Sequence, residues 1–107
     1  MNVHHHAELL TAQASSGSPY LEFLRSDSLS VGLYVLRVGD LDRQLPHAED
    51  EIYVVMSGSA QFTAGEETRD VTSGDTIYVA AGVPHRFHDI MADMQLIVVF
   101  APPESVP

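Results

Sequence analysis

The sequence predicts an all-β fold, an antiparallel sandwich or barrel with at most one short helix. Three observations support this prediction. From Tyr20 onward, short segments rich in valine, isoleucine, leucine and aromatic residues follow one another closely. Glycine, serine and aspartate residues of the kind that form turns separate these segments. A chain of 107 residues suits one domain with one modest hydrophobic core.

Residues 1–19 are expected to form an extension that precedes the barrel. The tract His4–His6 is either natural or the remnant of a purification tag, so it carries no weight in the fold prediction. Ala7–Ala14 contains helix-compatible side chains, and Ser15–Pro19 would end a helix there. The extension therefore predicts a short helix followed by a break.

The barrel domain is expected over residues 20–101, followed by a proline-rich tail at residues 102–107. Gly65-Glu66-Glu67 is typical of a hairpin turn between two short strands. The expected strands are Tyr20–Leu24, Leu29–Val38, Glu51–Met56, Ala60–Ala64, Thr68–Val71, Thr76–Val79, His85–His88 and Met94–Ala101.

The charge balance argues against several kinds of partner. Five Lys+Arg oppose fifteen Asp+Glu, and the resulting net charge of −10 repels phosphate backbones and anionic membranes. No cysteine is present for a disulfide or a thiolate metal site. There is no signal-peptide pattern, and the apolar run Leu96–Ala101 is far too short to span a bilayer. We expect a soluble, cytoplasmic protein that binds small molecules, not nucleic acid or membrane.

Two histidines and one glutamate are the main candidates for a functional site. His47 and Glu51 lie at the start of one expected strand, and His85 begins another. Two imidazoles and one carboxylate on a rigid β framework can hold a divalent metal and leave positions open for substrate. The alternatives are an exposed polar pair for His47 and Glu51, and for His85 a core histidine bonded to a backbone carbonyl.

Strand alternation predicts which side chains share a face with these residues. If Glu51 points inward, Tyr53 does so too, as a residue that fills the barrel. If His85 points inward, Asp89 shares its face, whereas His88 points to the opposite face. Parity therefore separates the two histidines as ligand candidates.

The segments around these residues resemble the two motifs of the cupin superfamily, in particular of its small single-domain members. Leu45 stands where the first motif has the first histidine of a pair, and Asp89 and Ala80 replace an asparagine and a proline of the second. The residues in register with the motifs are Gly39, His47, Glu51, Gly58, Gly74, Gly82 and His85. The resemblance covers residues 39–89.

The resemblance implies an antiparallel jelly-roll β-barrel with a metal inside, and a homodimer. The implied ligands of Fe(II), Mn(II), Ni(II), Co(II) or Zn(II) are His47, Glu51 and His85. Leu45 would leave open a position that the family commonly fills with a further histidine. Gln44 is adjacent to that position, but strand parity would turn its side chain away.

Two classes of function follow from this interpretation. One is a metal-dependent enzyme that acts on a small organic molecule, either a dioxygenase-like Fe(II) enzyme or a Zn(II) or Mn(II) isomerase or lyase. Asp89, if inward, would then be the nearest general base. The other is a module that binds or senses a small ligand without turnover, because the fold serves both purposes.

Overall fold

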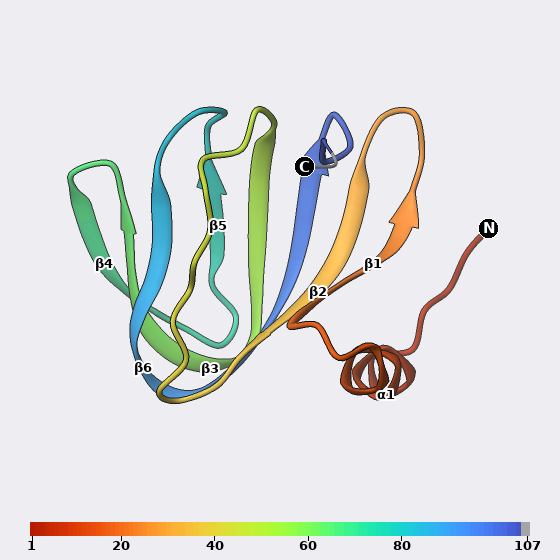
Figure 1. The fold of residues 1–107 in the computed structure, drawn as a ribbon, viewed down its shortest axis with the longest axis horizontal. Coiled ribbons are helices and arrows are strands. Elements are labelled where there is room, and N and C mark those ends of the chain that lie inside the picture. The colour runs from red at the N-terminus through yellow and green to blue at the C-terminus, as the bar shows by residue number, and fades with distance from the viewer. Residues whose placement is uncertain (106–107) are drawn as a thin grey trace.

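The computed structural model describes residues 1–105, and its main feature is a six-stranded sheet in which all strand pairs are antiparallel (Figure 1). Its elements are α1 (His6–Ser16), β1 (Tyr20–Arg25), β2 (Ser30–Leu36), β3 (Asp50–Ala64), β4 (Glu67–Thr72), β5 (Thr76–Val79) and β6 (His85–Ala101). The prediction of an all-β fold with a short N-terminal helix is confirmed. The predicted tail includes residues 106 and 107, which lie outside the described residues.

Helix α1 packs beside the sheet, against β1 and β2 (Figure 1). Its buried residue is Leu9, and it ends at Gly17, whose φ of 72° lies in the left-handed region that glycine adopts without strain. The predicted break after the helix is therefore a glycine cap. No helix in the described part of the chain is long and apolar enough to cross a membrane.

The sheet has the strand order β1-β2-β6-β3-β4, and β5 pairs with the first part of β3. The two longest strands, β3 and β6, pair with each other along most of their length. Figure 1 shows both strands bending at the base of the molecule, so that each belongs to both arms of the folded sheet. The core lies between the arms.

Four of the expected strands are halves of two longer ones. Glu51–Met56 and Ala60–Ala64 are both part of β3, and His85–His88 and Met94–Ala101 are both part of β6. The residues between these halves form irregularities in the pairing of β3 with β6, where the register shifts, and they do not form turns. The separate strands predicted here were therefore wrong.

Gly58 marks the bend in β3. Its φ is 94°, and a Cβ atom at this position would lie 2.3 Å from the backbone oxygen of Asp93. Only glycine permits both the conformation and the close approach of β6. The almost fully buried side chains of the core between the arms include Tyr53, Phe87, Leu36, Met94, Val55, Leu96 and Val98.

Candidate metal centre

His47, Glu51 and His85 come together at one end of the space between the arms. Each offers one ligand atom, and these atoms all lie within 4.8 Å of one another. His85 Nε2 is 2.8 Å and His47 Nε2 is 4.0 Å from the same carboxylate oxygen, Oε1 of Glu51. The residues singled out in the sequence therefore form one cluster.

Different elements position the three side chains. Glu51 is at the start of β3 and His85 is the first residue of β6. His47 lies in the loop before β3, and its backbone oxygen accepts a hydrogen bond from the Gly82 N–H at 2.8 Å. This bond ties the loop of one motif to the turn that precedes the histidine of the other.

Glu51 has an environment that is unusual for a carboxylate. The residue is 1% exposed, and apart from the contact with His85 neither of its side-chain oxygens has a hydrogen-bond donor in the range that the structure describes. Its close polar contact is the imidazole of His85. Because a buried charge without donors is costly, a carboxylate that faces two imidazoles in this way fits a divalent metal, which would supply the missing positive charge.

His85 is oriented for ligation through Nε2. Its Nδ1 donates to the backbone oxygen of Val83 at 2.9 Å, which leaves Nε2 directed at the cluster. Burial by itself lowers the pKa of His85, but the hydrogen bond and charge of Glu51 and the bond to Val83 outweigh it and raise the pKa above 6.5. The metal-free site therefore holds a proton on this histidine more strongly than an ordinary imidazole does.

Tyr53 and Gln44 complete a ring of polar atoms around the cluster. The Tyr53 hydroxyl lies 3.1 Å from His85 Nε2 and donates to Gln44 Oε1 at 2.8 Å. Gln44 Oε1 also lies 3.2 Å from His47 Nε2. Burial, followed by the charge of Glu51, raises the pKa of Tyr53 above its usual value of 10, so the hydroxyl stays protonated. Tyr53 points inward as predicted.

A buried aspartate holds Gln44 in place. Asp42 Oδ2 accepts from Gln44 Nε2 at 2.7 Å and from the Phe87 N–H at 2.9 Å, while Oδ1 accepts from the Tyr34 hydroxyl at 2.6 Å. These donors compensate the burial of the carboxylate. Sequence reasoning missed Asp42, because nothing local separates it from the exposed Asp40.

The structure corrects two expectations about orientation. Asp89, expected to point inward, has a side chain that is 73% exposed and contacts His88 rather than the cluster. The strand irregularity opposite Ser59 and Gln61 breaks the alternation here, and Asp89 has a φ of 49°. Gln44, expected to point away, faces the cluster, because the loop before β3 is not a strand and has no fixed parity. His88 lies outside the cluster, as predicted.

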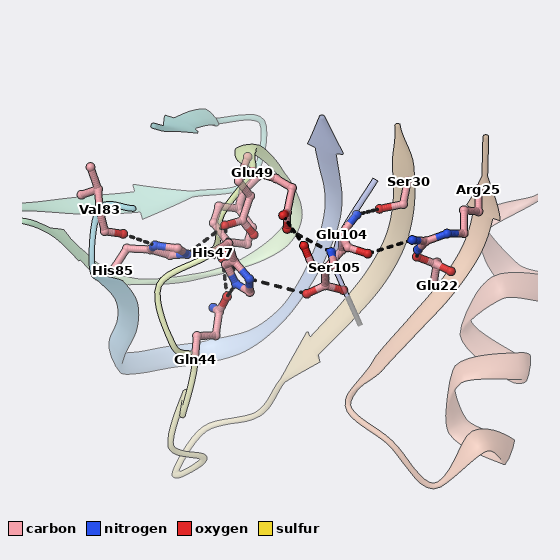
Figure 2. A network of polar contacts seen from close by, with 12 residues as sticks. Glu22, Arg25, Ser30, Gln44, His47, Glu49, Val83, His85, Glu104 and Ser105 are labelled. Atoms are coloured by element: carbon pink, nitrogen blue, oxygen red, sulfur yellow. Dashed lines mark hydrogen bonds and ion pairs between the residues drawn. The ribbon is translucent and has the colours of Figure 1, made fainter. Parts of the chain in front are cut away.

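The C-terminal tail crosses beside the site, which the sequence did not indicate (Figure 2). Glu104 Oε2 lies 3.6 Å from Nδ1 of His47, on the side of the ring away from the cluster. The Glu104 backbone is tied to Arg25 and Ser30, both by hydrogen bonds of 2.9 Å. Burial and the charge of Glu51 raise the pKa of Glu104. The tail thus places a carboxylate behind a candidate ligand.

A pocket of about 370 Å³ opens next to the ligands. Its wall includes His47, Glu51 and Tyr53 from the site, together with Arg43 and other residues: Pro19, Tyr20, Tyr34, Leu41, Gln44, Val98, Phe100 and Glu104. This volume is at the lower end of the range for small-molecule sites. A second cavity of about 470 Å³, near Tyr78 on β5, contains none of the candidate ligands.

The comparisons with known proteins agree with this architecture. The family model of the cupin domain matches residues 32–100. An uncharacterised protein of Streptomyces coelicolor is 51% identical over 98 residues, which cover 92% of this chain and 93% of that protein. An RmlC-like cupin of Methanocaldococcus jannaschii with a double-stranded β-helix fold has a TM-score of 0.71 at 18% identity, with 78% of each chain covered. The DMSP lyase DddQ of Ruegeria pomeroyi has a TM-score of 0.66 at 26% identity, with 71% of this chain and 39% of that one covered.

Proposed function

The chain belongs to the cupin domain family, and on this basis we propose that it is a metal-dependent enzyme that acts on a small organic molecule. The observation that carries the proposal is the buried carboxylate of Glu51, which has no hydrogen-bond donor other than His85 among the described residues and faces the imidazoles of His47 and His85. A binding or sensor module with the same metal site is the alternative.

The proposed site assigns a role to each group. His47, Glu51 and His85 would hold one divalent ion: Fe(II), Mn(II), Ni(II), Co(II) or Zn(II). The bound ion would supply a Lewis-acid centre and, as Fe(II), reactivity toward O₂. The neighbouring pocket would hold the substrate, and Arg43 in its wall could pair with a carboxylate. Asp89 has no role in this proposal, since its side chain points away from the cluster.

Two reaction classes suit this arrangement. Two imidazoles and one carboxylate that leave positions open for substrate and O₂ favour a dioxygenase-like reaction with Fe(II). The likeness to the DMSP lyase of Ruegeria pomeroyi supports a second candidate, an elimination or isomerisation in which Zn(II) or Mn(II) polarises a carbonyl.

Metal content and turnover test the proposal together. The protein is purified with glutamine at positions 4–6, because the tract His4–His6 would otherwise bind metal itself, and its metals are measured by elemental analysis. O₂ uptake and anaerobic product formation are then followed with a panel of small organic acids and diketones. Stoichiometric metal with turnover supports an enzyme, and the need for O₂ separates the two reaction classes. Stoichiometric metal with ligand-induced stabilisation and no turnover would instead support the binding module.

We also propose that the protein is a cytoplasmic homodimer. The resemblance to small cupins motivates the dimer. The exposed apolar side chains of Ile52, Met56 and Tyr78 on β3 and β5 offer a surface that a second copy would cover. The high negative charge gives no reason to expect a nucleic-acid partner.

A further inference from the structure

We infer that the side-chain oxygen of Gln44 is an additional ligand of the proposed metal, in the place that the family motif gives to the first histidine of its pair. This inference rests on the proposed metal site and adds a residue to it. It replaces the expectation that Leu45 leaves that position vacant.

The side-chain oxygen of Gln44 lies next to the candidate ligands. Gln44 Oε1 lies 3.2 Å from Nε2 of His47, the same nitrogen that faces Glu51. It is also bonded to the Tyr53 hydroxyl, which in turn contacts Nε2 of His85. The amide oxygen therefore belongs to the same ring of polar atoms as the three candidate ligands.

The amide of Gln44 has the orientation that ligation requires. A neutral amide ligates through its oxygen, so the site needs this atom and not the NH₂ group to face inward. Asp42 determines which end of the amide faces the cluster. Its carboxylate can only accept hydrogen bonds, and it accepts one from the Gln44 NH₂ group at 2.7 Å. Asp42 is itself held by the Tyr34 hydroxyl and the Phe87 N–H. The buried carboxylate thus turns the oxygen toward the cluster.

Leu45 lies away from the cluster. Its side chain is 78% exposed, and the loop directs it to solvent rather than toward His47. A histidine placed there by the motif's register would point away from the cluster. The loop has instead brought the preceding residue, Gln44, to the site.

An oxygen ligand in place of an imidazole has a consequence for metal preference. Carbonyl and carboxylate oxygens suit Mn(II), whereas imidazole suits Zn(II), Ni(II) and iron. Gln44 would therefore shift the preference of the site toward Mn(II), relative to the same chain with a histidine at position 44.

The test is a titration with Co(II), whose visible absorption reports the ligands, in the chain with glutamine at positions 4–6. We expect Gln44→Leu to weaken Co(II) binding by at least about tenfold and to change the spectrum. Leu45→Ala is the matched control and should leave both unchanged. Gln44→His should bind more tightly than Gln44→Leu with a spectrum shifted by the new nitrogen, whereas Leu45→His should behave like the parent.

Two further measurements keep ligation separate from a structural role. Tyr53→Phe removes the hydroxyl that donates a hydrogen bond to Gln44 but leaves the amide oxygen in the chain. It should therefore weaken Co(II) binding less than Gln44→Leu does. Thermal unfolding of the metal-free variants shows whether the loop is intact. Equal Co(II) affinity and an equal spectrum in the parent and in Gln44→Leu would refute ligation by Gln44 but would leave the three-residue metal site standing. A parent chain that binds no Co(II) would refute the metal site itself and, with it, this inference.

Discussion

At the scale of single residues, the environment of Glu51 most constrains the chemistry of this protein. A solvent-excluded carboxylate usually has backbone or side-chain donors, and here its close polar contact is one imidazole. The raised pKa of His85 favours a proton on this ring, next to the carboxylate. A divalent ion would replace that proton, so metal binding and protonation compete for the same nitrogen.

The two neighbouring histidines of β6 provide a matched pair of substitutions. His85→Ala should abolish stoichiometric metal, because it removes a ligand and leaves Glu51 without its partner. His88→Ala should retain metal, since the His88 ring is bonded to Thr63 and Asp89 outside the cluster. Elemental analysis of both variants is the measurement. Equal metal in the parent and in His85→Ala would contradict the site, as would loss confined to His88→Ala.

At the scale of elements, the bend of the long strands determines where the site lies. β3 carries Glu51 at its start and bends at Gly58, where β6 approaches its backbone. This bend allows the two arms to close over one core. The loop before β3 and the C-terminal tail then approach the ligands from outside the sheet (Figure 2).

Two glycines with the same backbone conformation test the bend. Gly58 and Gly74 both have a φ of 94°, but a Cβ atom would meet backbone only at Gly58, and it would have open space at Gly74. Gly74→Ala should lower the free energy of unfolding by about 1 to 2 kcal/mol, through backbone strain alone. Gly58→Ala should lower it by at least about 3 kcal/mol, since overpacking adds to the strain. Urea unfolding measures both, and equal losses would rule out the steric argument.

The tail makes its own prediction through Glu104. If His47 ligates metal through Nε2, its Nδ1–H faces the carboxylate of Glu104, and such partners commonly strengthen metal binding. Glu104→Gln should therefore weaken metal affinity by about tenfold, at the low end of such effects because the contact is long. Glu22→Gln is the control, since Glu22 is bonded to Arg25. Competition with a chelator measures the metal affinity of both variants. Unchanged affinity in Glu104→Gln would show that the tail does not contribute to metal binding.

At the scale of the whole molecule, surface composition bears on assembly. The apolar side chains of β1 are half-buried, and helix α1 packs against this strand, so β1 offers little free apolar surface. More exposed apolar side chains lie on β3 and β5. A homodimer would bury this part of the sheet.

Sedimentation equilibrium at micromolar concentration tests the dimer. The parent should sediment as a dimer, and Ile52→Asp should shift it to monomer by placing a charge in the proposed interface. Val38→Asp, at an exposed apolar position in the loop after β2, should remain dimeric. A monomeric parent would contradict the prediction.

The pH dependence of metal binding follows from the sign of the His85 shift. The pKa of His85 is raised above 6.5, so protons already compete with metal for this ring at pH values above 6.5. At limiting metal concentration, the fraction of protein with bound metal should therefore fall as the pH is lowered through the raised pKa. In the metal-free protein, the same pair stabilises the fold below about pH 6.5 and loses this effect as the pH rises through the raised pKa. Equilibrium dialysis over this range provides the measurement. Occupancy independent of pH would contradict ligation by His85.

The sequence by itself determined the strand-rich segments and the short helix, and it predicted that His47, Glu51 and His85 lie in one cluster. The strands and the helix follow from local composition and residue spacing, whereas the resemblance to the two cupin motifs implied that the three residues lie together. Strand parity was also sufficient to separate His85 from His88. Outside regular strands the same rule failed, at Gln44 in a loop and at Asp89 beside a strand irregularity.

Only the tertiary structure decided how the loop and the tail complete the site. Gln44 faces the cluster because a buried Asp42 bonds to Tyr34 of β2 and to Phe87 of β6, which is 45 residues away in sequence. Glu104 reaches His47 because Arg25 and Ser30 hold the tail backbone. Such contacts join distant parts of the chain through particular donors and acceptors. They leave no periodic pattern in the sequence, so only the packed fold decides them.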